Sequence, residues 1–354
     1  MRRARSGAGH YSEAVTPPPT TALARGALVD AFGRVATDLR VSLTDRCNLR
    51  CTYCMPAQGL AWLPKPELLT DDELVRLVGV SVRLGVTDVR LTGGEPLLRR
   101  GITDLVARFA ALSPRPRLSL TTNGLGLDKL AGPLAAAGLD RVNVSLDTVD
   151  RAAFATLTRR DRLDDVVRGL AAAAAAGLRP VKVNAVAMRE VNLESAPDLL
   201  AWCLDRGYEL RFIEQMPLDA EHQWDRAQMV TQAELLDRLS ARFALTPTGE
   251  RVRGSAPAET WLVDGGPAVV GVIASVSQPF CGSCDRVRLT ADGQLRSCLF
   301  ARTEDDLRTP LRAGASDDAL AAQMIALLAA KKAGHGIDDP TFLQPARPMS
   351  AIGG

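Results

Sequence analysis

The sequence predicts an α/β protein: a partial (β/α)6 barrel of the TIM type, closed by a C-terminal α+β region that carries a second cysteine cluster. Between residues 38 and 213, short Val- and Leu-rich runs alternate six times with longer helical segments. Polar motifs fall at or just after the ends of these runs, where βα barrels place their active sites. After about residue 245 the helical alternation is lost, and glycine-rich turns follow. Six units instead of eight predict an open barrel.

The individual elements follow from residue periodicity. Thr70 and Glu73 form a capping box that begins a helix, and Gly138 and Gly177 are typical residues just beyond helix ends. The predicted strands span residues 39–43, 87–92, 117–122, 141–146, 181–186 and 209–213. The predicted helices run from residue 70 to about 84, over 102–112, up to Gly138, and over 162–176, 194–206 and 319–332.

These elements divide the chain into three parts. Residues 1–37 are predicted to be a flexible extension, because they are Arg-rich and contain Pro17, Pro18 and Pro19, which block helix formation. The extension faintly resembles an organellar transit peptide, but a disordered tail is favoured, and no apolar secretory signal is present. Residues 38–244 form the predicted barrel, and residues 245–354 form the closing region with the second cluster site.

Composition excludes several classes of function. The chain has 354 residues, 46% of them hydrophobic, and a net charge of +2. This charge is too small to predict nucleic-acid binding, and no apolar run is long enough to cross a membrane. Six of the seven cysteines fall into two triads, which indicates metal ligation in a reducing compartment and therefore a cytoplasmic location.

The first triad is Cys47, Cys51 and Cys54, with the spacing C-x₃-C-x₂-C on a loop that follows the first strand. A 4Fe–4S cluster usually takes four cysteines. Three ligands would leave one iron open to a non-protein ligand, which indicates chemistry more than electron storage. A zinc site with its fourth ligand elsewhere is the alternative.

The second triad is Cys281, Cys284 and Cys298. Its spacing makes zinc a stronger alternative here, although structural zinc prefers four ligands and His335 is the only downstream histidine. The remaining cysteine, Cys203, lies in a predicted helix and reads as a small core residue.

Cationic residues form the third motif. Arg286 and Arg288 alternate along a strand and share one face, while Arg40, Arg90 and Lys182 line or end barrel strands. Arginine suits phosphate oxygens. A convergence of five cations needs an anion such as a triphosphate, whereas the alternative is that each is a solvated surface charge.

The first triad and the Gly-Gly-Glu-Pro motif at residues 93–96 resemble the signature of the radical S-adenosylmethionine superfamily. The resemblance implies that S-adenosylmethionine chelates the open iron and that its reductive cleavage yields a 5′-deoxyadenosyl radical, which abstracts a substrate hydrogen. It also implies the residues that contact S-adenosylmethionine: Tyr53, Gly94, Glu95, Ser145 and Met216.

The pair of triads narrows the resemblance to the GTP 3′,8-cyclase family of molybdenum cofactor biosynthesis. Matching stretches lie at residues 42–47, 90–99, 181–184, 211–214 and 280–288. The resemblance implies a lyase that uses two 4Fe–4S clusters and cyclises GTP, with guanine bound at the second cluster. It implies GTP contacts at Arg40, Arg90, Thr121, Lys182, Arg286, Val287 and Arg288.

Further expectations follow from the same family. The C-terminal Gly353 and Gly354 are expected to reach into the active-site cavity, where they act with Arg286 and Arg288. A homodimer, a low-potential electron donor and transfer of the product to cyclic pyranopterin monophosphate synthase are also implied. Two other readings stay open: a peptide-modifying radical maturase with an auxiliary cluster, and a non-catalytic zinc or iron–sulfur protein.

Overall fold

The computed structural model describes residues 26–249 and 253–353, which form an α/β fold around one twelve-stranded mixed sheet. The strand order is β12-β11-β10-β1-β2-β3-β4-β5-β6-β9-β8-β7. From β10 to β9 all neighbours are parallel, and the outermost strands on each side pair antiparallel. The strands are β1 (Asp38–Ser42), β2 (Asp88–Thr92), β3 (Arg117–Thr122), β4 (Arg141–Ser145), β5 (Lys182–Ala187), β6 (Glu209–Glu214), β7 (Leu245–Pro247), β8 (Glu259–Val263), β9 (Val269–Ile273), β10 (Arg286–Leu289), β11 (Gln294–Arg296) and β12 (Asp305–Asp306).

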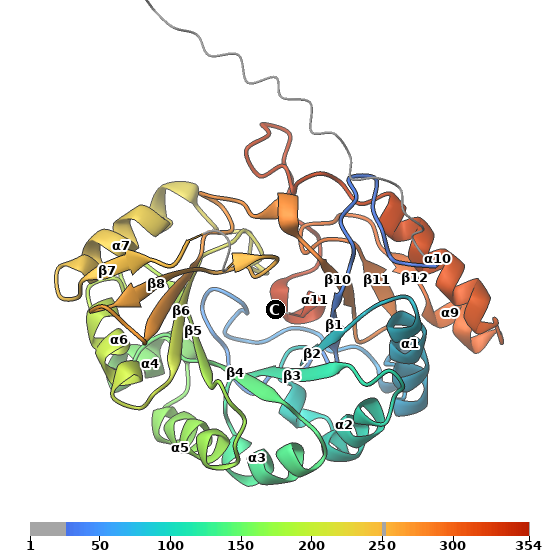
Figure 1. Cartoon of the computed structure of the whole chain (residues 1–354), viewed down its shortest axis with the longest axis horizontal. Coiled ribbons are helices and arrows are strands. Elements are labelled where there is room, and N and C mark those ends of the chain that lie inside the picture. Colours follow the sequence, from blue (N-terminus) through green and yellow to red (C-terminus); the bar gives the residue numbers. More distant parts are fainter. Residues whose placement is uncertain (1–25, 250–252, 354) are drawn as a thin grey trace, which may run out of the picture.

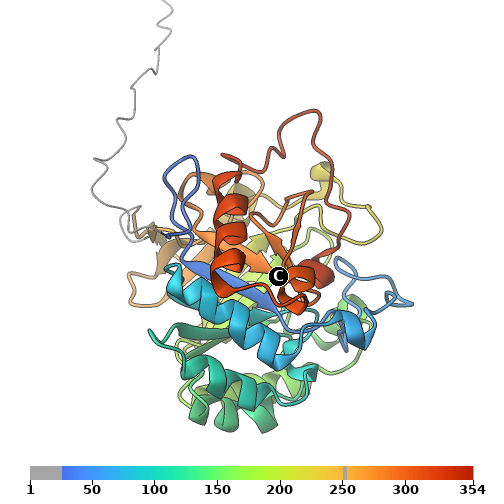
Figure 2. The same ribbon diagram turned by 90° about the vertical axis from the view of Figure 1, so that its right-hand side faces the viewer.

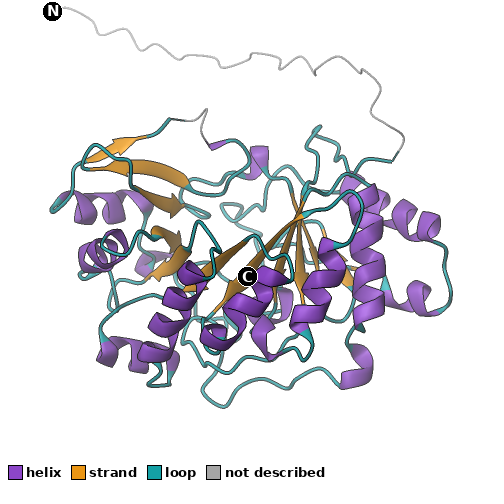
Figure 3. Cartoon of the chain, turned by 60° about the horizontal axis from the view of Figure 1, so that its bottom comes forward, coloured by secondary structure: helices purple, strands orange, loops and turns teal. Residues whose placement is uncertain are grey.

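Helices cover the outer face of the curved sheet, and the C-terminal helix α11 lies inside the curve (Figure 1). Figure 3 shows these helices as a layer in front of the fanned strands. The helices are α1 (Asp71–Arg83), α2 (Ile102–Ala110), α3 (Leu127–Ala136), α4 (Arg151–Thr158), α5 (Leu163–Ala175), α6 (Ala196–Leu204), α7 (Gln232–Ser240), α9 (Arg308–Arg312), α10 (Asp317–Ala329) and α11 (Met349–Ile352). The capping box of Thr70 and Glu73 is confirmed at the start of α1.

Residue alternation explains how the sheet separates a core from a cavity. Leu39 and Val41 of β1 are buried in the hydrophobic core under the helices. Arg40 lies between them and lines the cavity on the inner face. Successive side chains of a strand point to opposite faces, so apolar residues and cavity residues alternate along one strand. Each central strand thus contributes to both the core and the site.

The C-terminal part of the chain adds strands at both ends of the parallel sheet. β10 pairs in parallel with β1, and β9 pairs in parallel with β6. On the outside of the sheet, α10 lies beside α1 (Figure 2), and its Asp317 forms ion pairs with Arg76 and Arg83. The six parallel strands β1–β6 lie where the residue alternation predicts them, whereas their extension by β9 and β10 has no signal in the local sequence.

The described part of the N-terminal segment is packed on the domain. Leu28 is 1% exposed, and a β-bridge joins Val29 to Val35. Residues 26–37 therefore belong to the folded structure, unlike the extension predicted for them, while the expectation for residues 1–25 lies outside the described residues. Across the described ranges, the helices are all too short or too polar to span a bilayer.

Candidate active site

A cavity of about 310 Å³ opens at the C-terminal ends of the parallel strands. Both cysteine triads line it, although more than 220 residues of chain separate the first triad from the second. The predicted S-adenosylmethionine contacts line the same cavity, as do four of the five predicted cations. The structure thus brings most of the predicted site residues together in one place.

The loop of the first triad is held by the two glycines that follow β2. The backbone N–H of Gly94 donates to the carbonyl of Thr44 (2.7 Å), and the N–H of Glu95 donates to the carbonyl of Arg46 (2.7 Å). A Cβ atom on either glycine would collide with the backbone of residues 44–46. Only glycine allows this close approach. The Gly-Gly pair therefore positions the chain's own cysteine loop.

The cysteines of the first triad are half-buried. Asn123 donates to the Cys47 sulfur (3.8 Å), and Arg50 donates to the Cys47 carbonyl (2.8 Å). Burial raises the pKa of Cys51 well above its ordinary value, and burial raises the pKa of Cys54 to about 12. Neutral thiols are the favoured state here without a metal, because a buried thiolate needs a positive partner. Iron in a cluster supplies that partner.

Two buried carboxylates stand at the predicted S-adenosylmethionine contacts. Burial raises the pKa of Glu95 to about 7 against hydrogen bonds from Asn123 and Thr122. Asp147 accepts a hydrogen bond from the hydroxyl of Tyr53 (3.1 Å), and burial raises the pKa of Asp147 to about 6. Sequence reasoning missed Asp147, although it comes two residues after Ser145 at a strand end.

The second triad contains one sulfur with two cationic donors. The Nε of Arg286 lies 3.3 Å from the Cys284 sulfur, and the Nζ of Lys331 lies 3.7 Å from it. Burial acts to raise the pKa of Cys284, but Arg286 and Lys331 outweigh it and the pKa is lowered. This environment stabilises a thiolate, which is the form that binds iron.

The six thiols fit iron–sulfur clusters by their donor chemistry. Within the described ranges, no three His, Cys, Asp or Glu side chains are gathered tightly enough to bind a single metal ion. Thiols around a multi-iron cluster need not converge on one point, so this arrangement is compatible with a cluster on each triad.

Three arginines form a row across the inner face of the sheet. Arg40 of β1 is in register with Arg288 of β10 on one side and Arg90 of β2 on the other. Burial lowers the pKa of Arg90 to about 9, and Arg40 adds to this effect. Burial also lowers the pKa of Arg288 well below its ordinary value. An arginine guanidinium stays protonated in proteins, so the row presents clustered positive charge to the cavity.

Two predicted GTP contacts lie elsewhere. Lys182 is the first residue of β5 and pairs with Glu209 (2.6 Å) at the opposite end of the strand from the cavity mouth. Val287 is 1% exposed and packs in the hydrophobic core, as the alternation with Arg286 and Arg288 requires. Thr121, by contrast, lines the cavity.

Arg211 and Asn184 are cavity residues that the sequence analysis missed. The Nε of Arg211 donates to the Asn184 side chain (3.0 Å), and both residues line the cavity. Burial lowers the pKa of Arg211 to about 10. The signal was present in the sequence, because Arg211 lies between the apolar residues Leu210 and Phe212 of β6 as Arg40 lies between Leu39 and Val41 of β1.

The C-terminal tail packs against the row of arginines. The hydroxyl of Ser42 donates to the carbonyl of Ile352 (3.0 Å), and the guanidinium of Arg288 donates to the carbonyl of Gly353. A Cβ atom on Gly353 would collide with the Ser42 hydroxyl. Gly354 lies outside the described residues.

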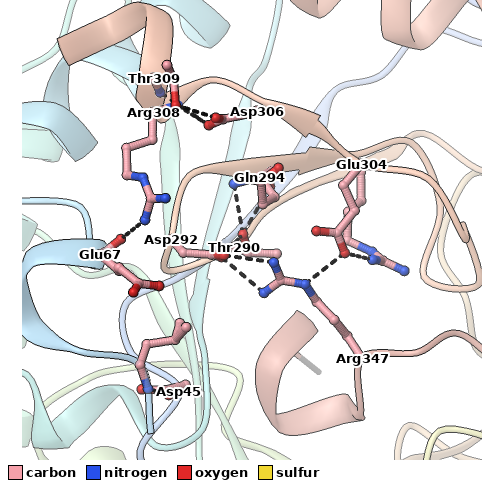
Figure 4. Close-up of polar contacts among 12 residues, drawn as sticks. Asp45, Glu67, Thr290, Asp292, Gln294, Glu304, Asp306, Arg308, Thr309 and Arg347 are labelled. Carbon is pink, nitrogen blue, oxygen red and sulfur yellow. Dashed lines mark hydrogen bonds and ion pairs between the residues drawn. The ribbon is translucent and has the colours of Figure 1, made fainter.

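An ionic network holds the segment before the tail. Arg347 binds both carboxylate oxygens of Asp292 (3.1 and 2.7 Å) and also Glu304 (2.9 Å), as Figure 4 shows. Glu304 in turn pairs with the buried Arg296. The network therefore ties the tail to the β10–β11 region, next to the loop that carries Cys298.

Comparisons with known proteins identify the class of the site. The family model of the radical SAM superfamily matches residues 41–203, and the model "Molybdenum Cofactor Synthesis C" matches residues 208–337. A crystal structure of Streptococcus suis SuiB bound to S-adenosylmethionine is similar, with a TM-score of 0.53 and 14% identity over 78% of this chain and 62% of that one. At this identity the likeness concerns the fold alone.

Close relatives define the family within that class. A GTP 3′,8-cyclase of Streptomyces coelicolor is 65% identical over 328 residues, 92% of this chain and 96% of that protein. A GTP 3′,8-cyclase of Mycolicibacterium smegmatis is 60% identical over 351 residues, 98% of this chain and 96% of that protein. The chain belongs to the GTP 3′,8-cyclase family. Its cofactors are accordingly S-adenosylmethionine and 4Fe–4S clusters.

Proposed function

We propose that this protein converts GTP to (8S)-3′,8-cyclo-7,8-dihydroguanosine 5′-triphosphate, the first step of molybdenum cofactor biosynthesis. The observation that carries the proposal is the meeting of both cysteine triads and the arginine row in one cavity. When bound, the first cluster and S-adenosylmethionine supply the radical that takes the ribose hydrogen. The chain's own residues have to bind GTP, orient it and keep water out.

The cationic residues of the cavity bind the triphosphate in this proposal. Arg40, Arg90 and Arg288 stand in register, and Arg286 is 7% exposed beside Cys284. Their planar guanidiniums suit phosphate oxygens. Thr121, Arg211 and the backbone near Val287 complete this part of the site, whereas Lys182, which pairs with Glu209 away from the cavity, takes no part in it. The anchored phosphates fix the ribose between the triads.

The two cysteine triads that line the cavity hold the two clusters in this proposal. Cys47, Cys51 and Cys54 hold the first cluster, and Tyr53, Gly94, Glu95, Ser145 and Met216 contact S-adenosylmethionine. Cys281, Cys284 and Cys298 hold the second cluster, which binds the guanine. The C-terminal tail brings the carbonyl of Gly353 into contact with Arg288, and the role expected for Gly354 concerns a residue outside the described ranges.

The division into domains, the location, the oligomeric state and the partners of the enzyme are part of the same proposal. Residues 38–244 form the partial (β/α)6 barrel, and residues 245–354 form the region with the auxiliary cluster. The enzyme works as a cytoplasmic homodimer, takes electrons from a low-potential donor and passes its product to cyclic pyranopterin monophosphate synthase.

An anaerobic assay tests the proposal directly. The reconstituted protein is analysed for iron and sulfide, incubated with dithionite, S-adenosylmethionine and GTP, and examined for products by mass spectrometry. About eight irons per chain, with 5′-deoxyadenosine and cyclised GTP formed together, support the proposal. Cleavage of S-adenosylmethionine without cyclised GTP would indicate another substrate, and bound zinc without cleavage would exclude the radical reaction.

A further inference from the structure

Lys331 is a buried cation that the proposed function leaves without a role. It follows α10, is 4% exposed, and lies beside the second cysteine triad. Its Nζ donates to the carbonyls of Cys284 (3.1 Å) and Arg286 (2.9 Å). No ion pair within the described ranges includes Lys331. A lysine buried without a carboxylate partner is costly, so its position calls for another source of negative charge.

The geometry of the ammonium group indicates where that charge lies. An ammonium has three N–H donors and no acceptor. Two donors are taken by the two carbonyls, and the sulfur of Cys284 lies 3.7 Å from the same Nζ. Arg286 contacts this sulfur as well (3.3 Å). Among the described residues, no cationic side chain donates a hydrogen bond to the sulfur of Cys281 or Cys298, so Cys284 is the ligand that cations contact directly.

We propose that Lys331 is a positioning and tuning residue of the auxiliary cluster: it fixes the backbone of residues 284–286 and raises the reduction potential of the cluster through its charge at the Cys284 sulfur. The proposal rests on the proposed function, because it requires the cluster on the second triad. One-electron reduction makes a cluster more negative. A positive group at a ligand sulfur therefore favours the reduced form, and hydrogen bonds to cluster sulfurs are known determinants of potential.

Arg34 provides a matched control for the loop-fixing part of this role. Its guanidinium donates to the carbonyls of Cys281 (2.6 Å), Lys332 (2.6 Å) and Ala333 (2.8 Å). It therefore holds the same cysteine loop and the segment that carries Lys331. Its charge is paired with Asp30 (2.6 Å), and it donates to backbone carbonyls instead of sulfur. Loss of Arg34 should loosen the loop without removing charge from the cluster.

The test measures the auxiliary cluster alone. Full-length protein with Cys47, Cys51 and Cys54 changed to Ala is reconstituted, and iron and sulfide are counted to verify one cluster. The midpoint potential of this protein is then measured by dithionite titration followed by electron paramagnetic resonance. The same measurement is made on versions of it that also carry Lys331→Met, Lys331→Arg or Arg34→Gln. We expect Lys331→Met to shift the midpoint potential to more negative values. Lys331→Arg should keep the midpoint close to that of the protein with Lys331, and Arg34→Gln should shift it less than Lys331→Met does.

Each other outcome decides the question. An unchanged midpoint in Lys331→Met, or an equal shift in Arg34→Gln, would overturn the tuning role. If Lys331→Met binds no cluster, recovery of the cluster in Lys331→Arg supports a requirement for the charge, whereas loss in both overturns it. The titration contains no GTP, so failure of this proposal is distinct from failure of the unsubstituted protein to cyclise GTP.

Discussion

Arg40 of β1 and Arg288 of β10 are register partners on adjacent parallel strands, and both side chains line the cavity. Neither takes part in an ion pair within the described ranges. Arg288 is 4% exposed, and burial lowers the pKa of both groups. Like charges that are withdrawn from water cost stability unless an anion joins them. Asp38 offsets part of this positive charge, since burial acts to raise the pKa of its carboxyl but Arg40, Arg90, Arg286 and Arg288 outweigh burial and lower it. The remaining positive charge is available to a substrate anion.

Replacement of Arg40 should improve stability and impair binding at the same time. In Arg40→Met the ligand-free protein no longer bears the desolvation cost of this charge, which outweighs its attraction to Asp38, so we expect its free energy of unfolding to rise by about 1 kcal/mol. The KM for GTP should rise about tenfold or more, because a phosphate contact is lost. Thermal unfolding and steady-state kinetics measure the two effects.

The control for that pair of effects is Arg117→Met. Arg117 is also on the sheet, but its side chain is 72% exposed and pairs with Asp88. We expect the free energy of unfolding of Arg117→Met to stay within about 0.5 kcal/mol of that of the unsubstituted protein. Its KM for GTP should be unchanged. A destabilised Arg40→Met protein with normal KM would contradict the anion-site interpretation.

Gly353→Ala should displace the tail. Gly353 has φ of 89°, and a Cβ atom there would meet the Ser42 hydroxyl and come within 2.9 Å of the Thr92 methyl carbon. We expect product formation to fall at least about tenfold, with normal iron content and faster hydrogen exchange in residues 349–353. Gly336→Ala is the matched control, since Gly336 has φ of 71° but no neighbouring atom within 4 Å. Equal losses in both variants would attribute the effect to backbone strain alone.

Cysteine replacements should separate cluster ligands from core residues. We expect Cys298→Ala to reduce the iron content from about eight to about four per chain and to abolish cyclisation. Cys203 is a buried core residue of α6, so Cys203→Ala should keep the full iron content and lose only a little thermal stability. Iron analysis and the electron paramagnetic resonance spectrum measure both variants. An unchanged iron content in Cys298→Ala would remove it from the ligand set.

Binding of S-adenosylmethionine should depend on the ionisation of Glu95. Burial raises the pKa of Glu95 to about 7 in the folded protein from an ordinary value of 4.5. A ligand ammonium favours the ionised carboxylate, so affinity should fall as the pH falls below 7, by up to about tenfold per unit. Anaerobic titrations between pH 6 and 8 test this, and Glu95→Gln should flatten the profile.

Ionisation of Glu95 should have the opposite effect on the stability of the ligand-free protein. Because the folded pKa lies above the unfolded one, ionisation of Glu95 destabilises the fold progressively as the pH rises from 4.5 to 7. Glu95→Gln should therefore gain stability relative to the unsubstituted protein at pH 8 and show less gain at pH 5. A constant difference between the two proteins across this range would contradict the assignment.

Local signals in the sequence were enough for the central strands and both cysteine triads. The alternation of Leu39, Arg40 and Val41 defines β1 and its cavity side at once, and the same reading extends to Arg90 and Arg288. The same alternation in β6 places Arg211 on the cavity face, so this residue was also predictable from the sequence. These features depend on a few neighbouring residues, which is why sequence reasoning reaches them.

Long-range pairing was beyond the reach of those signals. The position of Lys182 depends on Glu209, its register partner on the next strand, which holds the ammonium away from the cavity. Arg34 was placed in a flexible extension because nothing near it in the sequence predicts its contact with Cys281, 247 residues away. Packing between distant segments decides both positions, so local composition does not reveal them.

The parallel pairing of β1 with β10 has a consequence for how the protein is made. A growing chain exposes the edge of β1 until residues 286–289 have been synthesised. An unpaired strand edge invites aggregation. The proposed phosphate site also lacks Arg286 and Arg288 until then, so we expect a nascent chain to bind GTP weakly. Biosynthesis therefore leaves the active site incomplete until almost the whole protein has left the ribosome, and a C-terminally truncated product should be both insoluble and unable to retain substrate.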